Sequence, residues 1–522
     1  MHVALQIHEI LVLIFKEADR HTLLAATSCC RVFSAAALDV LWRVIQGFSP
    51  LLRIHPAFQT YPSPRLHHHW QILQGVISDE AWARFDDYAR RVRLFYNRYP
   101  GDDPESIHPS VYLYLARRVQ FIFPHLTQIN LNLEYLDDET GISTLLCLPP
   151  SLRRLELSYY SPEYFSDGKY IVGAILDQIP NTAPDIVDLR IDLHLPDDYL
   201  DKIIRMKQLR TLALSEMTII SGYLWLHQFP TLTNLTNLTL SVINIPGQDP
   251  SFPLDWRDLT CLRNLTMHGL LENFAYILSA LPADQLHALK LTMDGRRTLA
   301  KDSWSQKLWQ ELHTCLNLIS KHYSLHEIKL DLQTLELHDN ITRDEMIFPP
   351  FLPIIQPLLS LRLLRTAIFR AFPPIDLSND NIFTCAESWP DIETLDFPFT
   401  LRTTISLDTV KPLLSKCHKL IHLGIALDRL DFSIGLEHRP WSTILATLRI
   451  HISTVSDPHD AAAYLLQLFP VLRKVQSFTY DRDVNSAVMC ANMGNAMKAL
   501  RGETSEPEWP LFLCFQQSST ID

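Results

Sequence analysis

The sequence predicts an α/β protein in which a small helical unit precedes an irregular repeat solenoid, with a parallel sheet on the concave face and helices outside. Three observations predict this fold class. The first glycine is Gly47 and the first proline is Pro50, apolar triplets recur between 122 and 484, and helical spacing fills several stretches between the triplets. We expect four segments, which are a helical unit over 1–46, a helical connector over 47–121, degenerate repeats over 122–484, and a cap and tail over 485–522.

The first segment lacks helix-breaking residues and contains several alanines, which predicts helices near 7–17, 21–28 and 31–45. The six consecutive apolar residues from Ile10 to Phe15 would surround the axis of the first helix. A helix that is apolar all round must be covered all round, and so small a unit has little core of its own. We therefore expect either the rest of the chain or another protein to cover one side of this helix.

The same segment contains an ordered set of spaced elements, which are Leu5, Ile7, Glu9-Ile10-Leu11, Ile14-Phe15, Leu23-Leu24, Cys30-Arg31, Phe33, Ala37-Leu38 and Leu41-Trp42-Arg43. The set resembles an F-box of the variety abundant in large fungal F-box families, although Gln6-Ile7 stands where the family has Leu-Pro. In that family the three helices dock on a Skp-family adaptor, which joins them to a cullin–RING ubiquitin ligase. The resemblance implies, position by position, a set of adaptor-binding residues: Leu5, Ile7, Glu9, Ile10, Ile14, Phe15, Leu24, Cys30, Arg31, Phe33, Leu41 and Trp42.

The connector over 47–121 contains an apolar stripe at steps of three and four residues, formed by Trp82, Phe85, Ala89, Val92 and Tyr96. This spacing is typical of one face of an amphipathic helix. We expect the connector to be a helical brace between the first segment and the repeats.

The repeats follow an apolar-x-x-apolar-x-apolar pattern, as in Leu152/Leu155/Leu157, with poorer matches at Leu361/Leu364 and Leu472/Val475. Most neighbouring triplets lie 23 to 28 residues apart, which is within the period of leucine-rich repeats. The last two apolar positions point to the same side of a short strand. Because one unit cannot bury that side alone, stacked units form a continuous parallel sheet and core.

The residues that alternate with the buried ones are expected to line the concave face of the sheet. They are polar and mixed in charge, which suits a protein partner better than a polyanion. The candidate target-binding surface consists of Arg154, Glu156, Asp188, Arg190, Asp192, Asn237, Asn264, His268, Lys290, Glu327, Lys329, Asp331, Arg449 and His451.

Composition narrows the class of protein further. The net charge is −12 and no basic run occurs, so the electrostatic signature of a nucleic-acid-binding protein is absent. Nine scattered cysteines indicate a reducing compartment. With no signal-peptide pattern and no long apolar window, we expect a cytoplasmic or nuclear protein with no membrane contact. No catalytic motif or metal-ligand spacing occurs, so we expect no enzyme activity, no cofactor and no metal site.

Together these features predict a substrate-recognition subunit of an SCF-type (Skp–cullin–F-box) ubiquitin ligase. The helical unit would bind a Skp-family adaptor and the cullin ligase core, and the repeats would bind an unknown target protein. An alternative is a leucine-rich-repeat scaffold without a ligase role, in which the N-terminal helices cap the open end of the solenoid.

Overall fold

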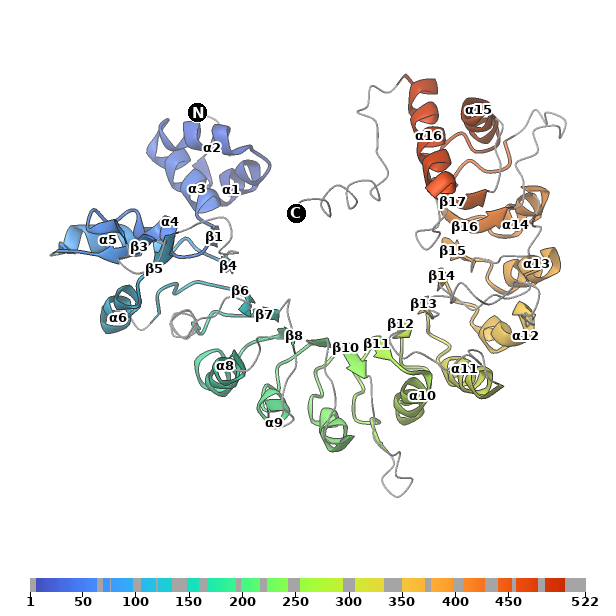
Figure 1. Cartoon of the computed structure of the whole chain (residues 1–522), viewed down its shortest axis with the longest axis horizontal. Helices are drawn as coiled ribbons and strands as arrows, with labels where there is room; N and C mark the ends of the chain where they lie inside the picture. The colour runs from blue at the N-terminus through green and yellow to red at the C-terminus, as the bar shows by residue number, and fades with distance from the viewer. Residues whose placement is uncertain are drawn as a thin grey trace. The chain divides into compact units, whose positions relative to one another are not determined.

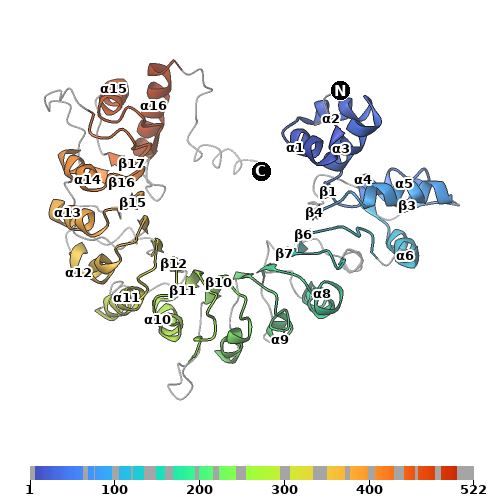
Figure 2. The same ribbon diagram turned by 180° about the vertical axis from the view of Figure 1, so that it is seen from behind.

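The computed structural model describes residues 6–502 apart from 63–68, 76, 97–104, 119–120, 134–147, 159–167, 194–198, 216–222, 243–253, 294–305, 333–349, 371–376, 398–404, 406, 428–439, 453–456 and 477–483. The chain forms two compact units, a first unit over Met1–Ser241 and a second unit over Val242–Asp522. Each unit contains a parallel sheet whose helices lie on one side of the strands, as Figure 1 and the reverse view in Figure 2 show.

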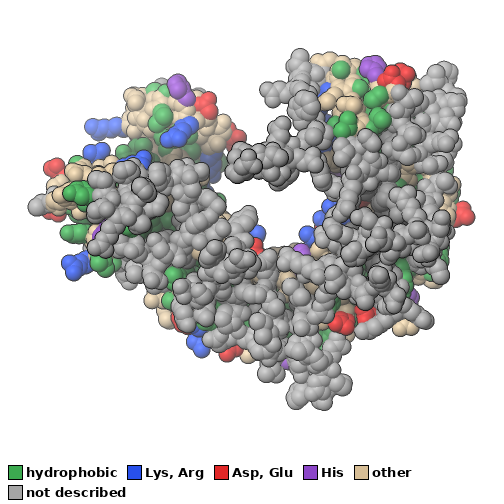
Figure 3. All heavy atoms as spheres, viewed as in Figure 1, with side chains coloured by type: hydrophobic (Ala, Val, Ile, Leu, Met, Phe, Trp, Pro, Cys, Tyr) green, Lys and Arg blue, Asp and Glu red, His purple; other side chains and the backbone are tan. Residues whose placement is uncertain are grey.

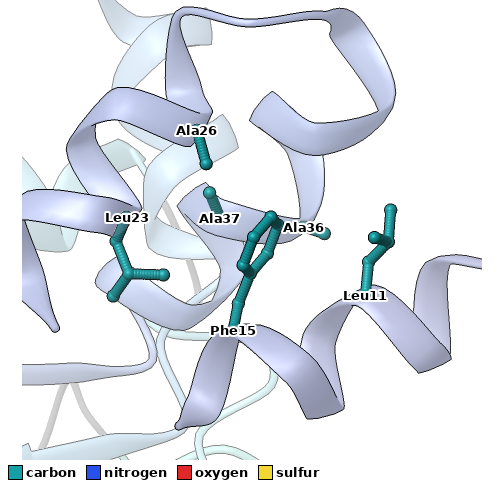
Figure 4. Packing of buried hydrophobic residues seen from close by; sticks show 6 residues of the cluster. All are labelled: Leu11, Phe15, Leu23, Ala26, Ala36 and Ala37. Atoms are coloured by element: carbon teal, nitrogen blue, oxygen red, sulfur yellow. The ribbon is translucent and has the colours of Figure 1, made fainter. Parts of the chain in front are cut away.

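The first unit begins with three helices, α1 (His8–Lys16), α2 (Arg20–Thr27) and α3 (Arg31–Leu41). The Asp19 side chain caps α2 by accepting a hydrogen bond of 2.7 Å from the Thr22 N–H. A small core joins the helices, and Figure 4 shows its six buried side chains: Leu11, Phe15, Leu23, Ala26, Ala36 and Ala37. The first two expected helices are confirmed. The third ends at Leu41 instead of continuing to residue 45, because the next residues form strand β1 (Val44–Gln46).

The connector over 47–121 is only partly helical, because strands lie between the expected helices in its described part. It contains α4 (Ser49–Leu52), α5 (Asp79–Ala89) and α6 (Pro109–Arg118), together with strands β2 (Phe58–Pro62), β3 (His69–Leu73), β4 (Leu94–Tyr96) and β5 (Glu105–Ile107). The apolar spacing that begins at Trp82 is helical only as far as Ala89, where α5 ends. Tyr96 instead belongs to β4, which pairs in parallel with β1. Strand β3 pairs antiparallel with β2 and parallel with β5.

The large sheet of the first unit has the strand order β1-β4-β6-β7-β8-β9-β10, and all these neighbours pair in parallel. The further strands are β6 (Gln128–Asn132), β7 (Arg154–Ser158), β8 (Asp188–Asp192), β9 (Thr211–Ser215) and β10 (Asn237–Val242). The connecting segments include α8 (Gly168–Thr182), α9 (Leu200–Ile203) and the 3-10 helix η6 (Tyr223–Thr231).

The second unit repeats this arrangement in the order β11 to β18, again all in parallel. Its strands are β11 (Asn264–Gly269), β12 (Ala288–Met293), β13 (Glu327–Asp331), β14 (Thr366–Arg370), β15 (Thr394–Asp396), β16 (His422–Leu427), β17 (Thr447–Ile452) and β18 (Lys474–Gln476). Its helices are α10 (Leu271–Ala280), α11 (Gln306–Ile319), α12 (Phe351–Ile355), α13 (Asn379–Ser388), α14 (Val410–Lys416), α15 (Pro458–Leu468) and α16 (Val484–Leu500), with 3-10 helices η8 (Gln356–Ser360) and η9 (Leu407–Thr409). Helix α16 contacts α15 and β18.

The apolar triplets form the core, as the repeat pattern predicts; Leu152, Leu155 and Leu157, for example, are all fully buried. One backbone carbonyl per repeat accepts two hydrogen bonds from the next repeat. The Arg153 carbonyl accepts the N–H groups of Val187 and Asp188 at 2.9 and 3.0 Å. These backbone bonds fix the register, and in two of the described repeats a threonine hydroxyl also donates to the corresponding carbonyl, as Thr127 does to Arg93 at 2.9 Å and Thr236 to Arg210 at 2.9 Å. The predicted α/β leucine-rich-repeat fold is therefore confirmed.

Strand β14 corrects the register expected for its repeat. The triplet is Leu364, Ala367 and Phe369, all fully buried, so Leu364 is the first apolar position of the triplet and not the second. Leu361 lies in the turn that precedes it. The small side chain of Ala367 obscured the pattern.

Candidate functional site

Large apolar side chains are exposed on the three N-terminal helices. Ile7, Ile14 and Leu24 are 43%, 50% and 53% exposed, and Leu13, which was not among the predicted contacts, is 61% exposed. Steps of three and four residues place Ile7, Ile10 and Ile14 on the same side of α1, whereas Leu11 and Phe15 point into the core. Hydrophobic side chains are visible on the surface over these helices in Figure 3. Leu13 lies about 100° round α1 from Ile14, and Leu24 is on α2. We call the four exposed side chains Ile7, Leu13, Ile14 and Leu24 together the apolar stripe.

The structure divides the other predicted adaptor contacts between surface and core. Glu9, Cys30 and Arg31 are exposed, Ile10 is half-buried, and Leu5 lies outside the described residues. Phe15 was expected among the adaptor contacts, but the structure buries it in the core of the three helices. Phe33 and Leu41 are half-buried against the same core, and the Phe33 ring meets Phe15 edge-on at 5.8 Å between centroids.

Trp42 is turned towards the rest of the first unit. Its ring lies 4.7 Å from that of Tyr88 on α5, between centroids, so a change at Trp42 would disturb this joint as well as any adaptor contact. Asp39 strengthens the joint, because it forms an ion pair with Arg91 and its Oδ2 lies 2.8 Å from His8 Nε2. Arg91 also donates to the Ala35 carbonyl at 3.2 Å. Sequence reasoning missed Tyr88 and Arg91, which belong to the segment interpreted only as a helical stripe.

The open strand face, which is the side of each sheet opposite the helices, carries a charge cluster in the first unit. Asp188 on β8 is buried, and its Oδ2 lies 2.7 Å from the Nε of Arg154 on β7. Its Oδ1 lies 3.2 Å from the Nε of Arg190. Both arginines are about half exposed. The three predicted residues therefore come together, with the carboxylate holding two guanidinium groups in fixed positions.

A second cluster lies on the open strand face of the second unit. Asp396 on β15 places its Oδ2 2.5 Å from Arg449 Nη1 and 3.4 Å from Arg370 Nε, and the Asp396 and Arg449 side chains are only 7% and 10% exposed. Burial raises the pKa of Asp396, and the positive charges of Arg449 and Arg370 oppose this shift. Its Oδ1 lies against Gly424 on β16. Sequence reasoning singled out Arg449 but missed Arg370, because the register of β14 was assigned three residues too early.

The remaining candidates lie on the strands that were expected to carry them. Lys329 and Glu327 pair with each other at 2.6 Å, and Asn237 donates to the Thr211 hydroxyl at 3.1 Å. His451 is placed on β17 opposite Ala426, but its side chain lies outside the described residues. The others on the strands are Glu156, Asp192, Asn264, His268, Lys290 and Asp331.

No group of three or more His, Cys, Asp or Glu residues in the described part of the chain could hold a metal ion. Among the same residues, no helix combines the length and hydropathy needed to cross a membrane. The candidate functional residues lie on two kinds of surface, the apolar stripe and the open strand face.

Comparisons with known proteins add little beyond the fold. No protein-family model and no curated protein matches the sequence. The chain is similar to the solved structure of an internalin from Listeria monocytogenes, with 13% identity, 72% of this chain and 95% of that chain covered, and a TM-score of 0.35. It is also similar to a leucine-rich-repeat protein of Leptospira interrogans, with 13% identity, 68% and 96% covered, and a TM-score of 0.25. The fold assignment rests on the strand order, register and buried triplets of the chain itself.

Proposed function

We propose that the chain is the substrate-recognition subunit of an SCF-type ubiquitin ligase, acting in the cytoplasm or nucleus. The observation that carries the proposal is the apolar stripe, whose four large side chains are 43% to 61% exposed. An exposed group of such side chains on an otherwise folded unit is typical of a protein-binding surface. The stripe lies on helices whose sequence resembles an F-box, so the partner we propose is a Skp-family adaptor and, through it, the cullin core.

The alternative of a solenoid cap fits the packing less well. A cap covers the open core of the first strand with its own apolar residues. Here the core cluster of the N-terminal helices consists only of residues between Leu11 and Leu41. The first strands are covered by the segment that follows, since the Phe48 ring contacts Phe95 at 4.9 Å and Phe123 at 5.6 Å between centroids.

The repeats would hold the target protein on the open strand face. The clusters around Asp188 and Asp396 present arginines whose positions are set by a buried carboxylate. Fixed charged groups favour one partner over others more than they add affinity. The receptor needs no chemistry of its own, because tethering the target beside a ubiquitin-charged enzyme raises their effective concentration.

The proposal is tested by measuring binding of the full chain to a purified Skp-family adaptor by titration calorimetry. We expect the changes Ile14→Glu and Leu24→Glu each to weaken binding about 30-fold or more, because removing a central apolar contact at an interface costs about 2 kcal/mol or more. Both side chains are at least half exposed, so the melting temperature should not change.

The matched control is Leu113→Glu, because Leu113 on α6 is 59% exposed in the same unit but lies outside the stripe. This variant should bind the adaptor as the unaltered chain does. If the unaltered, folded chain does not bind the adaptor, the receptor proposal fails and a scaffold function remains. Equal weakening by all three variants would show that binding does not use the stripe.

A further inference from the structure

Three of the turns that lead into the last five strands of the second unit differ from the turns of the first unit. The position three residues before each strand carries His125, Ser151, Asp185, Gln208 and Asn234 ahead of β6 to β10. The corresponding residues ahead of β14 to β18 are Leu363, Asp391, Lys419, Ile444 and Val471. Asp391 and Lys419 pair with each other at 2.7 Å. Three apolar side chains therefore occupy a row that is polar throughout the described repeats of the first unit.

Two of these apolar residues are neighbours and have a third beside them. Ile444 and Val471 each stand three residues before a strand, β17 and β18, and these strands pair with Thr447 opposite Lys474. Because neighbouring strands are about 4.8 Å apart, Ile444 and Val471 lie in adjacent turns. The carbonyl of Ile421 accepts the Ala446 N–H at 2.9 Å, which places Ile421 beside the same turn. The three side chains are 37% to 39% exposed. We call Ile421, Ile444 and Val471 the turn patch.

The surroundings of the turn patch are basic, although the whole chain has a net charge of −12. Arg473 and Lys474 lie two and three residues after Val471 and are exposed. Lys419 is neutralised by Asp391. A segment that fits this patch must combine apolar side chains with negative charge.

The chain itself contains such a segment, and it starts beside the patch. The Arg501 guanidinium, just after α16, donates to the carbonyls of Pro470 and Leu472, on either side of Val471. Leu500, the last residue of α16, is 43% exposed. Residues 503–522 lie outside the described residues, and their sequence places three glutamates before a strongly apolar stretch: Glu503, Glu506, Glu508, Trp509, Leu511, Phe512, Leu513 and Phe515.

We propose that residues 503–515 bind the turn patch of the same chain. The apolar stretch would cover Ile421, Ile444 and Val471, and the glutamates would lie near Arg473 and Lys474. The six residues between Gly502 and Trp509 give seven Cα–Cα steps, which can span at most about 25 Å. This length is several strand spacings and is ample to reach the patch. Burial of the aromatic and leucine side chains supplies the apolar part of the free energy, and the opposite charges set the orientation. The inference does not depend on the ligase proposal.

The test places a photoreactive side chain in the full chain, by the change Phe512→benzoylphenylalanine, and maps the cross-links formed on irradiation by mass spectrometry. We expect cross-links within one chain to the turns that contain Ile421, Ile444 and Val471. A second change, Ile444→Asp, should lower their yield about tenfold, because a lost apolar contact together with like-charge repulsion costs about 1.4 kcal/mol or more. Replacing Glu503, Glu506 and Glu508 with glutamine leaves the patch intact and should lower the yield and its dependence on salt.

The control is Leu113→Asp, which adds a charge at an exposed apolar residue of α6 and should leave the yield unchanged. Cross-links that map mainly to other surfaces, or that join two chains and increase with concentration, would overturn the proposal. The same holds if the yield is unaffected by both the Ile444 and the glutamate changes. Melting temperatures measured alongside show whether a variant has lost its fold.

Discussion

The change Gly424→Ala tests how tightly the charge cluster of the second unit is built. A Cβ atom added at Gly424 would lie 1.9 Å from Asp396 Oδ1 and 2.7 Å from its Cγ. Ordinary van der Waals contacts of a carbon atom are about 3.5–4.0 Å. The carboxylate must therefore move away from β16, and the distance of 2.5 Å between its Oδ2 and Arg449 Nη1 cannot be kept.

The cost follows from the burial of the pair. Asp396 and Arg449 are 7% and 10% exposed. Removing one partner of a buried ion pair costs about 3–5 kcal/mol, because the other charge is left uncompensated. Moving the carboxylate off Arg449 leaves both charges poorly compensated, so we expect a cost of the same order. Alanine recovers up to about 1 kcal/mol, because glycine loses more conformational freedom on folding. We expect the free energy of unfolding of the second unit to fall by about 2–4 kcal/mol, which lowers its melting temperature by about 5–15 °C.

Thermal unfolding followed by circular dichroism measures this change, and Gly494→Ala is the matched control. Gly494 lies within α16, and a Cβ there meets no atom within 4 Å, so alanine should stabilise the helix by up to about 1 kcal/mol. The double change Gly424→Ala with Asp396→Ala should cost less than the sum of the two single changes, because removing the carboxylate removes the clash. A Gly424→Ala protein that melts with the unaltered chain, or strictly additive effects in the double variant, would refute the reasoning.

Two further predictions concern buried titratable groups. Burial lowers the pKa of His322 to about 4 from 6.5, so the unfolded chain binds more protons between these values and stability falls as the pH drops through this window. The free energy of unfolding should fall by about 2 kcal/mol between pH 7 and pH 5, as measured by urea unfolding at the two pH values. A His322→Gln variant should not show this loss. An equal pH dependence of the two proteins would contradict the prediction. Burial also raises the pKa of four thiols, those of Cys315, Cys385, Cys417 and Cys490. A thiol reagent at pH 8 should therefore modify the exposed Cys29, Cys30 and Cys261 within minutes and reach the four buried thiols only on unfolding. Early modification of the buried thiols, detected by mass spectrometry, would contradict the prediction.

The repeats could be predicted because their sequence pattern is the physical requirement for the fold. Alternating apolar residues define which side of a strand is buried, and the apolar residue before them anchors the turn. The pattern failed where one of its side chains is small or missing. Ala367 weakened the triplet of β14, and β4 has only Val92 and Phe95 in place of a triplet.

The division of α1 between core and surface could not be predicted from its sequence. All residues from Ile10 to Phe15 are apolar, so no periodicity distinguishes the buried ones. The choice of Leu11 and Phe15 is made by α2 and α3, which contribute Leu23, Ala26, Ala36 and Ala37 to the same core. Trp42 is likewise placed by Tyr88, a residue from another helix.

The energetics of the apolar stripe indicate what else the proposed adaptor interface must contain. Fully burying one aliphatic side chain contributes about 1.5–3 kcal/mol, so four side chains that start about half exposed contribute about 3–6 kcal/mol on binding. Association itself costs about 4–15 kcal/mol. Over most of this range the stripe alone does not offset the cost of association. We therefore expect the exposed polar residues of the same helices, Glu9 and Arg31, to add charge-assisted hydrogen bonds of about 1.5–3 kcal/mol each. An adaptor that binds through this face must then present apolar groups and charges of both signs.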